Sequence, residues 1–242
     1  MEFALVGWQE DEPTLRLDYR TFSYAGKFAM SNTGKAVVRR TADGAPGGGS
    51  SEDDGEPAET DEQASVDGES AGSGFVSDPS EFDDDVLAAV AFNEDRTDPG
   101  VLWLRYVTVR ADHRGADLGP RLAAFVAERA RDRGYRRIRI AVNNPFAYQA
   151  LYKAGFAYTG RQTGLAELVL ERPGERDRPT YQCGFDVFRE RDLSAEERAF
   201  LDAKEDAEPP ARVEPPAEGE GGSGNPEIDA EGDERPRQDS GA

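Results

Sequence analysis

The sequence contains one cysteine and one histidine among 242 residues. A single cysteine cannot form an internal disulfide, and one of each residue excludes the common zinc sites built from four Cys or His ligands. No apolar run approaches the roughly 20 residues that a membrane-spanning helix needs. The N-terminal segment MEFALVGWQEDE lacks a basic region and turns acidic at once, unlike a secretory signal. We therefore expect a cytoplasmic protein with no metal cofactor and no membrane partner.

Lysine is scarce as well, with four Lys against 25 Arg, and 49 Asp and Glu give the chain a formal net charge of −20. An acid excess combined with few lysines indicates a halophile-like protein adapted to high salt, where charges are strongly screened. A coding bias toward arginine would deplete lysine too, so the sequence leaves both explanations open.

The acidic charge is concentrated in two segments. Residues 41–85 hold fifteen acidic residues and no Lys or Arg, and residues 192–242 hold sixteen acidic residues against five basic ones. Both are poor in apolar residues whose burial could offset the entropy of an ordered chain. We predict a disordered, acidic, Gly/Ser-rich insert at 41–85 and an acidic, mostly disordered tail at 192–242. The insert either keeps the protein soluble or shields a basic site.

Within the tail, the segment Ser194–Glu197 matches a capping box and predicts a short helix from about residue 194 to 204. The remaining residues, 1–40 and 86–191, carry a net charge of +6. They are enough for one domain with one core, whose N-terminal strands lie in 1–40 and whose main part is 86–191.

Hydrophobic patterns predict the elements of this domain. Strands are expected at 3–8, 14–24 and 35–40, and a β-hairpin at 86–92 and 101–109. Apolar residues at three- and four-residue spacing predict a helix at 118–133 that ends at Gly134. A strand at 138–142, a helix that begins at Asn144-Pro145 and reaches about residue 153, and a last strand at 180–188 follow. This order predicts an α/β fold with at least one parallel crossover.

The segment from Val107 to Leu122 is the most informative, because a strand there runs through a glycine-containing loop into a helix. Such a loop presents backbone N–H groups at a helix N-terminus, which favours anions. Residues 101–140 contain ten Arg against four acidic residues. They form either a polyphosphate site or a solvated, arginine-rich helix face.

Two motifs in this region resemble the GNAT superfamily of acyl-CoA-dependent N-acetyltransferases. Arg114-Gly-Ala-Asp-Leu-Gly119 is similar to the family's Gln/Arg-x-x-Gly-x-Gly/Ala cofactor motif, between a strand and a helix. Asn144-Pro-Phe-Ala147, followed by Leu151-Tyr-Lys-Ala-Gly-Phe156, is similar to its Asn-x-x-Ala…Leu-Tyr…Gly-Phe motif. The resemblance covers about residues 86–190. It implies a GNAT-like mixed, mostly antiparallel sheet flanked by helices.

The resemblance also implies a cofactor site for acetyl-CoA, used as a co-substrate. The loop amides would hold the pyrophosphate, and the preceding strand would pair with the pantetheine arm. The implied cofactor-binding residues are Val107, Val109, Arg114, Gly115, Ala116, Asp117, Leu118, Gly119, Pro120 and Asn144.

For the general acid, the resemblance implies Tyr152. It lies three residues before Gly155, where the family commonly has four, and one residue turns a helix by about 100°. Tyr148, one turn earlier, is therefore a second candidate, and either tyrosine could instead be a core residue.

Asp117 stands where the family has its first motif glycine. Aspartate tolerates unusual backbone angles, so the loop can still form. Its carboxylate would repel phosphate unless it points away or pairs with an arginine such as Arg121. The sequence leaves open whether cofactor binding is weakened or lost.

The implied function is transfer of an acetyl group from acetyl-CoA to a primary amine, on a small molecule or a peptide, by direct attack. The alternative is a catalytically idle protein of the same fold that binds acyl-CoA or a partner. No compelling general base is evident: Glu94, Asp95 and Asp98 are expected in a solvated hairpin loop, and His113 in a surface loop. Cys183 is expected in the core.

The acceptor site is less well defined. Residues 24–35 either line it or simply cover the sheet. The sequence shows no pattern of a nucleic-acid reader, and its acidic segments oppose such binding. Many proteins of the family dimerise, but no feature of this sequence requires a homodimer.

Overall fold

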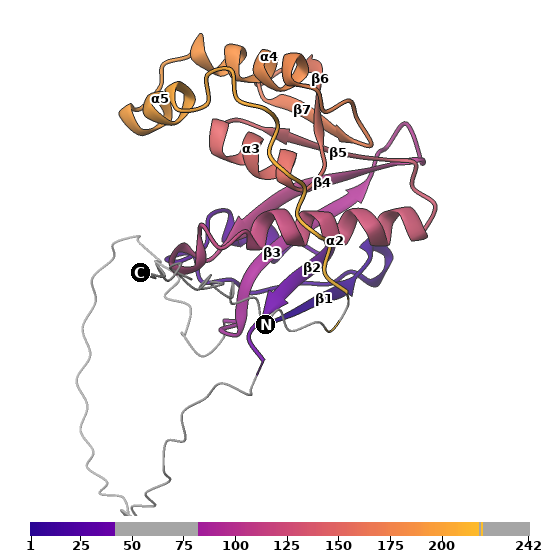
Figure 1. Cartoon of the computed structure of the whole chain (residues 1–242). Helices are drawn as coiled ribbons and strands as arrows, with labels where there is room; N and C mark the ends of the chain where they lie inside the picture. The colour runs from indigo at the N-terminus through magenta and orange to yellow at the C-terminus, as the bar shows by residue number, and fades with distance from the viewer. Residues whose placement is uncertain (42–81, 218, 220–242) are drawn as a thin grey trace, which may run out of the picture.

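The computed structural model describes residues 1–41, 82–217 and 219, and it contains one seven-stranded sheet of order β1-β2-β3-β4-β5-β7-β6 (Figure 1). The strands are β1 (Glu2–Gly7), β2 (Gly34–Arg39), β3 (Val86–Glu94), β4 (Val101–Val109), β5 (Arg137–Val142), β6 (Ala157–Gln162) and β7 (Leu168–Arg172). In this sheet only β4 and β5 pair in parallel. The predicted mixed, mostly antiparallel sheet with a parallel crossover is confirmed.

In the described ranges, five helices accompany the sheet. They are α1 (Ala25–Phe28), α2 (Leu118–Asp132), α3 (Pro145–Lys153), α4 (Arg178–Arg189) and α5 (Ala195–Asp202), with short 3-10 turns η1 (Gln9–Asp11) and η4 (Ala111–His113). The predicted helices at 118–133, 145–153 and 194–204 are confirmed to within two residues. Among the helices of the described ranges, none combines the length and the apolar character needed to cross a membrane.

Helices α2 and α3 pack against each other over the larger of two apolar cores. The inward face of α2 is fully buried, with Leu122, Phe125 and Val126 at 0% exposure. Gly134 has φ +96°, the left-handed geometry that commonly ends a helix and that glycine adopts without steric strain. The 3.6-residue spacing in the sequence therefore did identify the buried face of this helix.

The opposite face of the sheet is covered by residues 13–28. Leu15, Leu17 and Phe28 are buried in a second core against β2 and β3. The strand predicted at 14–24 is wrong, because this segment pairs with no strand. Its Arg16 amide donates to the Asp83 carboxylate at 2.7 Å, and its Leu15 amide donates to the Phe28 carbonyl at 3.0 Å. The alternation reflects burial of Leu15 and Leu17 without strand pairing, and it ends at Tyr19, which is 68% exposed.

Lys35 holds this covering segment in place from β2. Its ammonium is fully buried and donates to the carbonyl oxygens of Pro13, Met30 and Thr33 at 2.6–3.0 Å. Burial lowers the pKa of Lys35 to about 8. Residues 24–35 were expected either to line the acceptor site or to cover the sheet. Helix α1 covers the sheet, with Ala25 and Phe28 buried, whereas Tyr24 is 56% exposed.

The strand predicted at 180–188 is also wrong, because these residues form α4. Tyr181, Gly184, Phe185 and Phe188 are buried at helical spacing, and Asp177 caps the helix by accepting a hydrogen bond from the Thr180 amide at 2.8 Å. Tyr181, Phe185 and Phe188 lie three and four residues apart, as on one face of a helix. The strand prediction was based on an alternating pattern that required Cys183 to be buried. Cys183 is exposed, so its expected core position is wrong too.

Two strands, β6 and β7, were not predicted. They lie beyond β5 at the edge of the sheet, and α4 packs on β6. Their sequences contain glycine, charged residues and Gln162, so neither shows a clean apolar alternation. β7 pairs with β5, and β6 pairs with β7. This pairing and the burial that comes with it stabilise the two strands, although their local sequences show no strand pattern.

The chain continues after α5 as an extended segment that crosses α3 and α2 (Figure 1). The Val213 amide donates to the Lys153 carbonyl at 2.8 Å, and Arg176 donates to the Pro210 carbonyl at 2.7 Å. This segment belongs to the predicted acidic tail, whose residues 218 and 220–242 lie outside the described residues. Residues 42–81 of the predicted insert lie outside them as well.

Gly184 generates a stability prediction. A Cβ at this position would lie 2.1 Å from the Tyr148 hydroxyl oxygen. We expect Gly184→Ala to lower the free energy of unfolding by about 1–3 kcal/mol, since overpacking outweighs the better helix propensity of alanine. Urea unfolding followed by circular dichroism measures this. Cys183→Ala, on the exposed side of the same helix, is the matched control and should change stability by less than about 0.5 kcal/mol. Equal stability of Gly184→Ala and wild type would contradict the packing.

Candidate active site

The loop between β4 and α2 contains two residues with left-handed backbone geometry. Gly115 has φ +84° and Asp117 has φ +53°, both in the left-handed region. A Cβ on Gly119 would lie 3.3 Å from Val109 Cγ2, so the first turn of α2 is packed tightly on the end of β4. Leu118 and Pro120 are buried and anchor that turn. The sequence expectation that Asp117 tolerates this backbone is confirmed.

The N-terminus of α2 lacks a side-chain cap. Asn144, Asp177 and Ser194 each accept a backbone N–H at the start of α3, α4 and α5. Asp117 occupies the same position on α2, yet its carboxylate makes no capping hydrogen bond. The first N–H groups of an α-helix have no partner within the helix. Those of α2 lie beside the loop, at the end of the helix where the dipole favours an anion.

The Asp117 carboxylate is instead bound by α3. Lys153 Nζ lies 2.7 Å from Asp117 Oδ1, and both side chains are partly exposed. Arg121, the partner suggested by the sequence, stacks over the Phe3 ring at 5.1 Å and does not form this pair. The negative charge at position 117 is thus neutralised from another helix. Sequence reasoning missed Lys153, although it is the only lysine within the two motifs.

Strands β4 and β5 are hydrogen-bonded over only part of their length. Their parallel register runs from Val101↔Arg137 to Leu104↔Ile140 and stops there. On its other side β4 stays paired with β3 as far as Val109, with a one-residue irregularity that skips Arg105. The second half of β4 thus has an edge that is not paired with β5. An extended chain could hydrogen-bond to that edge.

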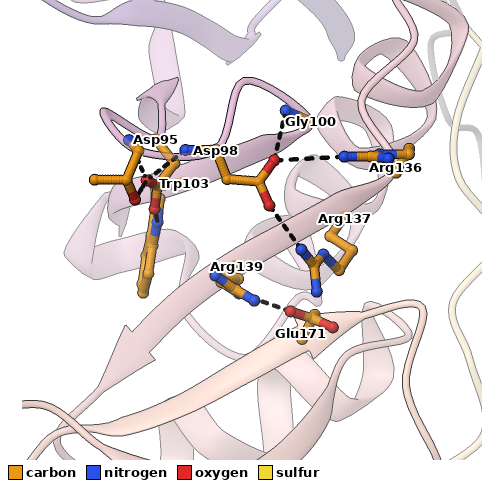
Figure 2. Close-up of polar contacts among 9 residues, drawn as sticks. Asp95, Asp98, Gly100, Trp103, Arg136, Arg137, Arg139 and Glu171 are labelled. Atoms are coloured by element: carbon orange, nitrogen blue, oxygen red, sulfur yellow. Dashed lines mark hydrogen bonds and ion pairs between the residues drawn. The ribbon is translucent and has the colours of Figure 1, made fainter.

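The opposite end of this strand pair is locked by Asp98 (Figure 2). Its carboxylate accepts from the Gly100 amide at 2.9 Å and from Arg137 Nη2 at 2.7 Å. The Gly100 carbonyl also accepts from the Arg136 amide at 2.9 Å. The Gly100 amide and then Arg137 hold the pKa of Asp98 below its usual value. Asp98, expected to be a solvated loop residue, is therefore a structural anchor.

Figure 2 also shows that Asp95 is engaged. It accepts from the Thr97 hydroxyl at 2.7 Å and from Trp103 Nε1 at 2.6 Å. The hydrogen bonds from Thr97, foremost, and from Trp103 hold the pKa of Asp95 well below its usual range. Neither hairpin aspartate is arranged as a base, and His113 Nδ1 is paired with Asp112 at 2.8 Å.

The other residues predicted for the cofactor fall around the same loop. Val107 and Val109 are half-buried against the larger core, and Gly115 and Ala116 are exposed. Arg114 is exposed, with Nη2 3.4 Å from Ser23 Oγ. Asn144 uses its carbonyl oxygen to cap α3 and donates Nδ2 to Asn143 at 3.1 Å, so its side chain is committed to local structure.

Tyr148 and Tyr152 lie in a buried aromatic cluster with residues of α4. Both are 0% exposed, and their hydroxyl oxygens are 3.3 Å apart. Tyr148 donates to the Tyr181 carbonyl at 3.0 Å, while Tyr152 accepts from the Tyr158 amide at 3.0 Å. The described structure thus gives both phenols the core position that the sequence left open. The residue four before Gly155 is Leu151, which is also buried.

Burial changes the acidity of these phenols. It raises the pKa of Tyr148 and Tyr152, and it raises the pKa of Tyr181 to about 12. A general acid works best when its pKa lies near the working pH. The local environment therefore favours neutral, structural tyrosines at this place. No group of three or more acidic, His or Cys side chains suited to a metal occurs in the described parts of the chain.

Comparison with known proteins gives one family match. A family model described as Acetyltransferase (GNAT) family matches residues 44–156, of which 82–156 are described. The match covers a little under half of the chain and shows a similarity to this family, and the mixed sheet is GNAT-like. No curated protein matches the chain.

Solved structures with similarity include nourseothricin acetyltransferase, with 25% identity, 37% of this chain and 59% of that chain covered, and a TM-score of 0.33. A GCN5-related N-acetyltransferase from Kribbella flavida has 26% identity, covers 39% and 64%, and has a TM-score of 0.32. The PaiA N-acetyltransferase from Thermoplasma acidophilum, solved with coenzyme A, has 15% identity, covers 36% and 52%, and has a TM-score of 0.31. This chain thus spans less than two thirds of each of them. Because these TM-scores are low, the similarity to the GNAT family is carried by the family match and by the sheet.

The buried phenols predict an alkaline loss of stability. An unfolded tyrosine loses its proton near pH 10, whereas folded Tyr181 keeps its proton up to a pKa of about 12. The folded state then binds more protons, so its contribution to stability is full below pH 10 and falls as pH rises from about 10 to 12. Tyr181→Phe should flatten the fall in urea-unfolding free energy across this range.

Tyr19→Phe is the control, because Tyr19 is 68% exposed and should keep the wild-type slope. Lys35 is present in all three proteins, so its own titration cancels. Identical slopes for the two variants would contradict the buried state of Tyr181.

The Asp117–Lys153 pair predicts a measurable coupling. In a double-mutant cycle of Asp117→Asn and Lys153→Met, unfolding at low salt should give a coupling energy of about 0.2–1 kcal/mol, as for other exposed pairs. In 1 M KCl the coupling should shrink because salt screens exposed charges. Zero coupling at low salt would show that the pair does not form in solution.

Proposed function

We propose that this chain is an N-acetyltransferase that moves the acetyl group of acetyl-CoA to a primary amine by direct attack. One observation carries the proposal: the uncapped N-terminus of α2 lies beside the unpaired edge of β4, in a chain that matches the GNAT family. The first feature suits a pyrophosphate, and the second suits the amide-bearing pantetheine arm.

The residues present fit such a cofactor. The exposed loop of Gly115 and Ala116 and the first turn of α2, with Leu118 and Gly119, would supply N–H groups to the phosphates. The loop also has room, since a Cβ on Gly115 would meet nothing within 4 Å. The Asp117 carboxylate would repel phosphate, but Lys153 Nζ lies 2.7 Å from its Oδ1 and offsets the negative charge. Arg114 would add positive charge.

When bound, acetyl-CoA supplies an activated acetyl thioester. The chain's part is to orient it along Val107 and Val109, and to offer β4 amides where negative charge develops on the carbonyl oxygen. The irregularity at Arg105 changes the direction of β4 next to the unpaired edge. We assign no general base among Glu94, Asp95, Asp98 and His113.

On the other face of the sheet, Tyr106 of β4 packs against the covering segment. Its ring lies 5.8 Å from that of Tyr24, and Lys27 Nζ lies 6.0 Å from its centroid. We propose that this aromatic surface borders the acceptor, a primary amine of a small molecule or a peptide. The proposed setting is cytoplasmic and salt-rich, without nucleic acid.

A second candidate is a catalytically idle protein that binds acyl-CoA or a partner. It is favoured by the absence of an accessible acid on α3: Tyr148 and Tyr152 are buried, and Leu151 stands four residues before Gly155. The two candidates share a cofactor site and differ in turnover.

Acetyl-CoA binding tests the site that both candidates share. Calorimetry at low salt should detect binding by wild type and binding about two- to fivefold tighter by Asp117→Gly, because removing one charge beside a helix N-terminus is worth up to about 1 kcal/mol at low ionic strength. Glycine suits the left-handed backbone at 117, so the loop is retained. Lys153→Met should weaken binding by a similar factor. If folded wild type and Asp117→Gly both fail to bind, the cofactor site is refuted.

Turnover then separates the candidates. Release of free thiol from acetyl-CoA with a panel of primary amines would identify an enzyme, and binding without turnover would identify the idle protein. In an enzyme, Tyr152→Phe should keep kcat within about threefold, as its hydroxyl is buried, while costing about 1 kcal/mol of stability. A much larger loss of kcat at unchanged stability would assign Tyr152 as the acid.

A further inference from the structure

A cavity of about 450 Å³ lies between the C-terminal half of α2, the turn after α3 and the end of β7. Four guanidinium groups line it, from Arg131, Arg136, Arg172 and Arg212. The apolar part of the lining includes Ile138. Four arginines on one concave surface repel one another unless carboxylates or a ligand compensate their charge.

The carboxylates around this cavity do not balance its arginines. Glu128 forms ion pairs with both Arg131 and Arg172, and Arg136 lies 3.5 Å from Asp98 (Figure 2 shows the latter contact). Asp98 is shared with Arg137 outside the cavity. Within the described ranges Arg212 forms no ion pair, so the cavity retains a net positive charge.

The neighbouring positive charges also affect the pKa of Arg172, which is largely buried. The Arg172 side chain is 17% exposed and donates to the Ala154 carbonyl at 2.9 Å. Burial, foremost, lowers the pKa of Arg172; Glu128 opposes this effect, and Arg212 and Arg131 add to it. Arg176 shows the same pattern, with burial first and Arg212 next, and its Nε is buried without a hydrogen-bond partner among the described residues.

This cavity is separate from the proposed cofactor loop. Asp117 and Arg131 lie on the same helix, and at about 1.5 Å per residue they are roughly 20 Å apart along its axis. The guanidinium groups of the cavity come from α2, from the start of β5, from the end of β7 and from the segment after α5. That segment contributes Arg212, one residue before its backbone contact with α3 at Val213.

We propose that the cavity is a second binding site, for a small organic anion that carries an oxyanion group on an apolar body. Guanidinium groups bind carboxylate and phosphate oxygens with two parallel hydrogen bonds. The apolar wall with Ile138 accommodates the body, as in ligand pockets generally. The bound anion neutralises the uncompensated charge and fastens the segment of Arg212 to the domain.

Binding of simple probes to the full-length chain tests the proposal. Phenyl phosphate and benzoate distinguish a phosphate from a carboxylate head, and inorganic phosphate tests the head without a body. Titrations at constant ionic strength should show saturable binding of at least one organic probe, about tenfold or more tighter than inorganic phosphate. Arg212→Ala should weaken that binding at least tenfold, and Arg212→Lys should weaken it less.

Arg96→Ala is the matched control, because it removes the same charge from an exposed position of the β3–β4 loop. It should leave the affinity within twofold of wild type. Equal affinities for Arg212→Ala and Arg96→Ala, equal affinity for inorganic and organic phosphate, or no binding of any probe at millimolar concentration would each overturn the proposal. The titrations contain no acyl donor, so their outcome and that of the acetyl-CoA experiment are independent.

Discussion

The partial pairing of β4 with β5 is the constraint on which the arrangement of the site depends. The two strands are parallel, so a crossover must connect them, and α2 is that crossover. Because their hydrogen bonds stop at Leu104 and Ile140, the later part of β4 keeps an edge unpaired with β5, next to the start of α2. Asp98 and Gly100 close the strand pair at its other end, through Arg136 and Arg137. A locked end and an open end on the same two strands give a fixed place for an extended ligand.

The charges of Asp117 and Lys153 keep the N-terminus of α2 free of a side-chain cap. The aspartate at the N-terminus of α2 would normally satisfy the helix N–H groups itself. Here its left-handed backbone and the ammonium of Lys153 turn the carboxylate away, so the helix end stays available to an anion. A substitution that looks unfavourable in the motif is thus compensated from α3.

Aromatic packing explains why the second motif is structural at its tyrosines. The hydroxyls of Tyr148 and Tyr152 are bound by backbone groups of α4 and β6, and Gly184 leaves the space that Tyr148 fills. Both tyrosines of α3 therefore pack against α4 as part of the contact between the two helices. The acyl-transfer proposal then depends on the loop and on β4, and the acid–base chemistry is left to groups outside this cluster.

The sequence by itself determined the local elements: the hairpin, α2 with its end at Gly134, and α3 with its cap at Asn144. These follow from periodicity and capping, which depend on neighbouring residues only. Its motif also singled out the loop between β4 and α2 as the candidate cofactor site. Only the tertiary structure decided that residues 14–24 pair with no strand, that 180–188 is a helix, and that β6 and β7 complete the sheet. It alone brought Lys153 to Asp117 and Arg212 to Arg172, because such contacts depend on how elements distant in sequence pack.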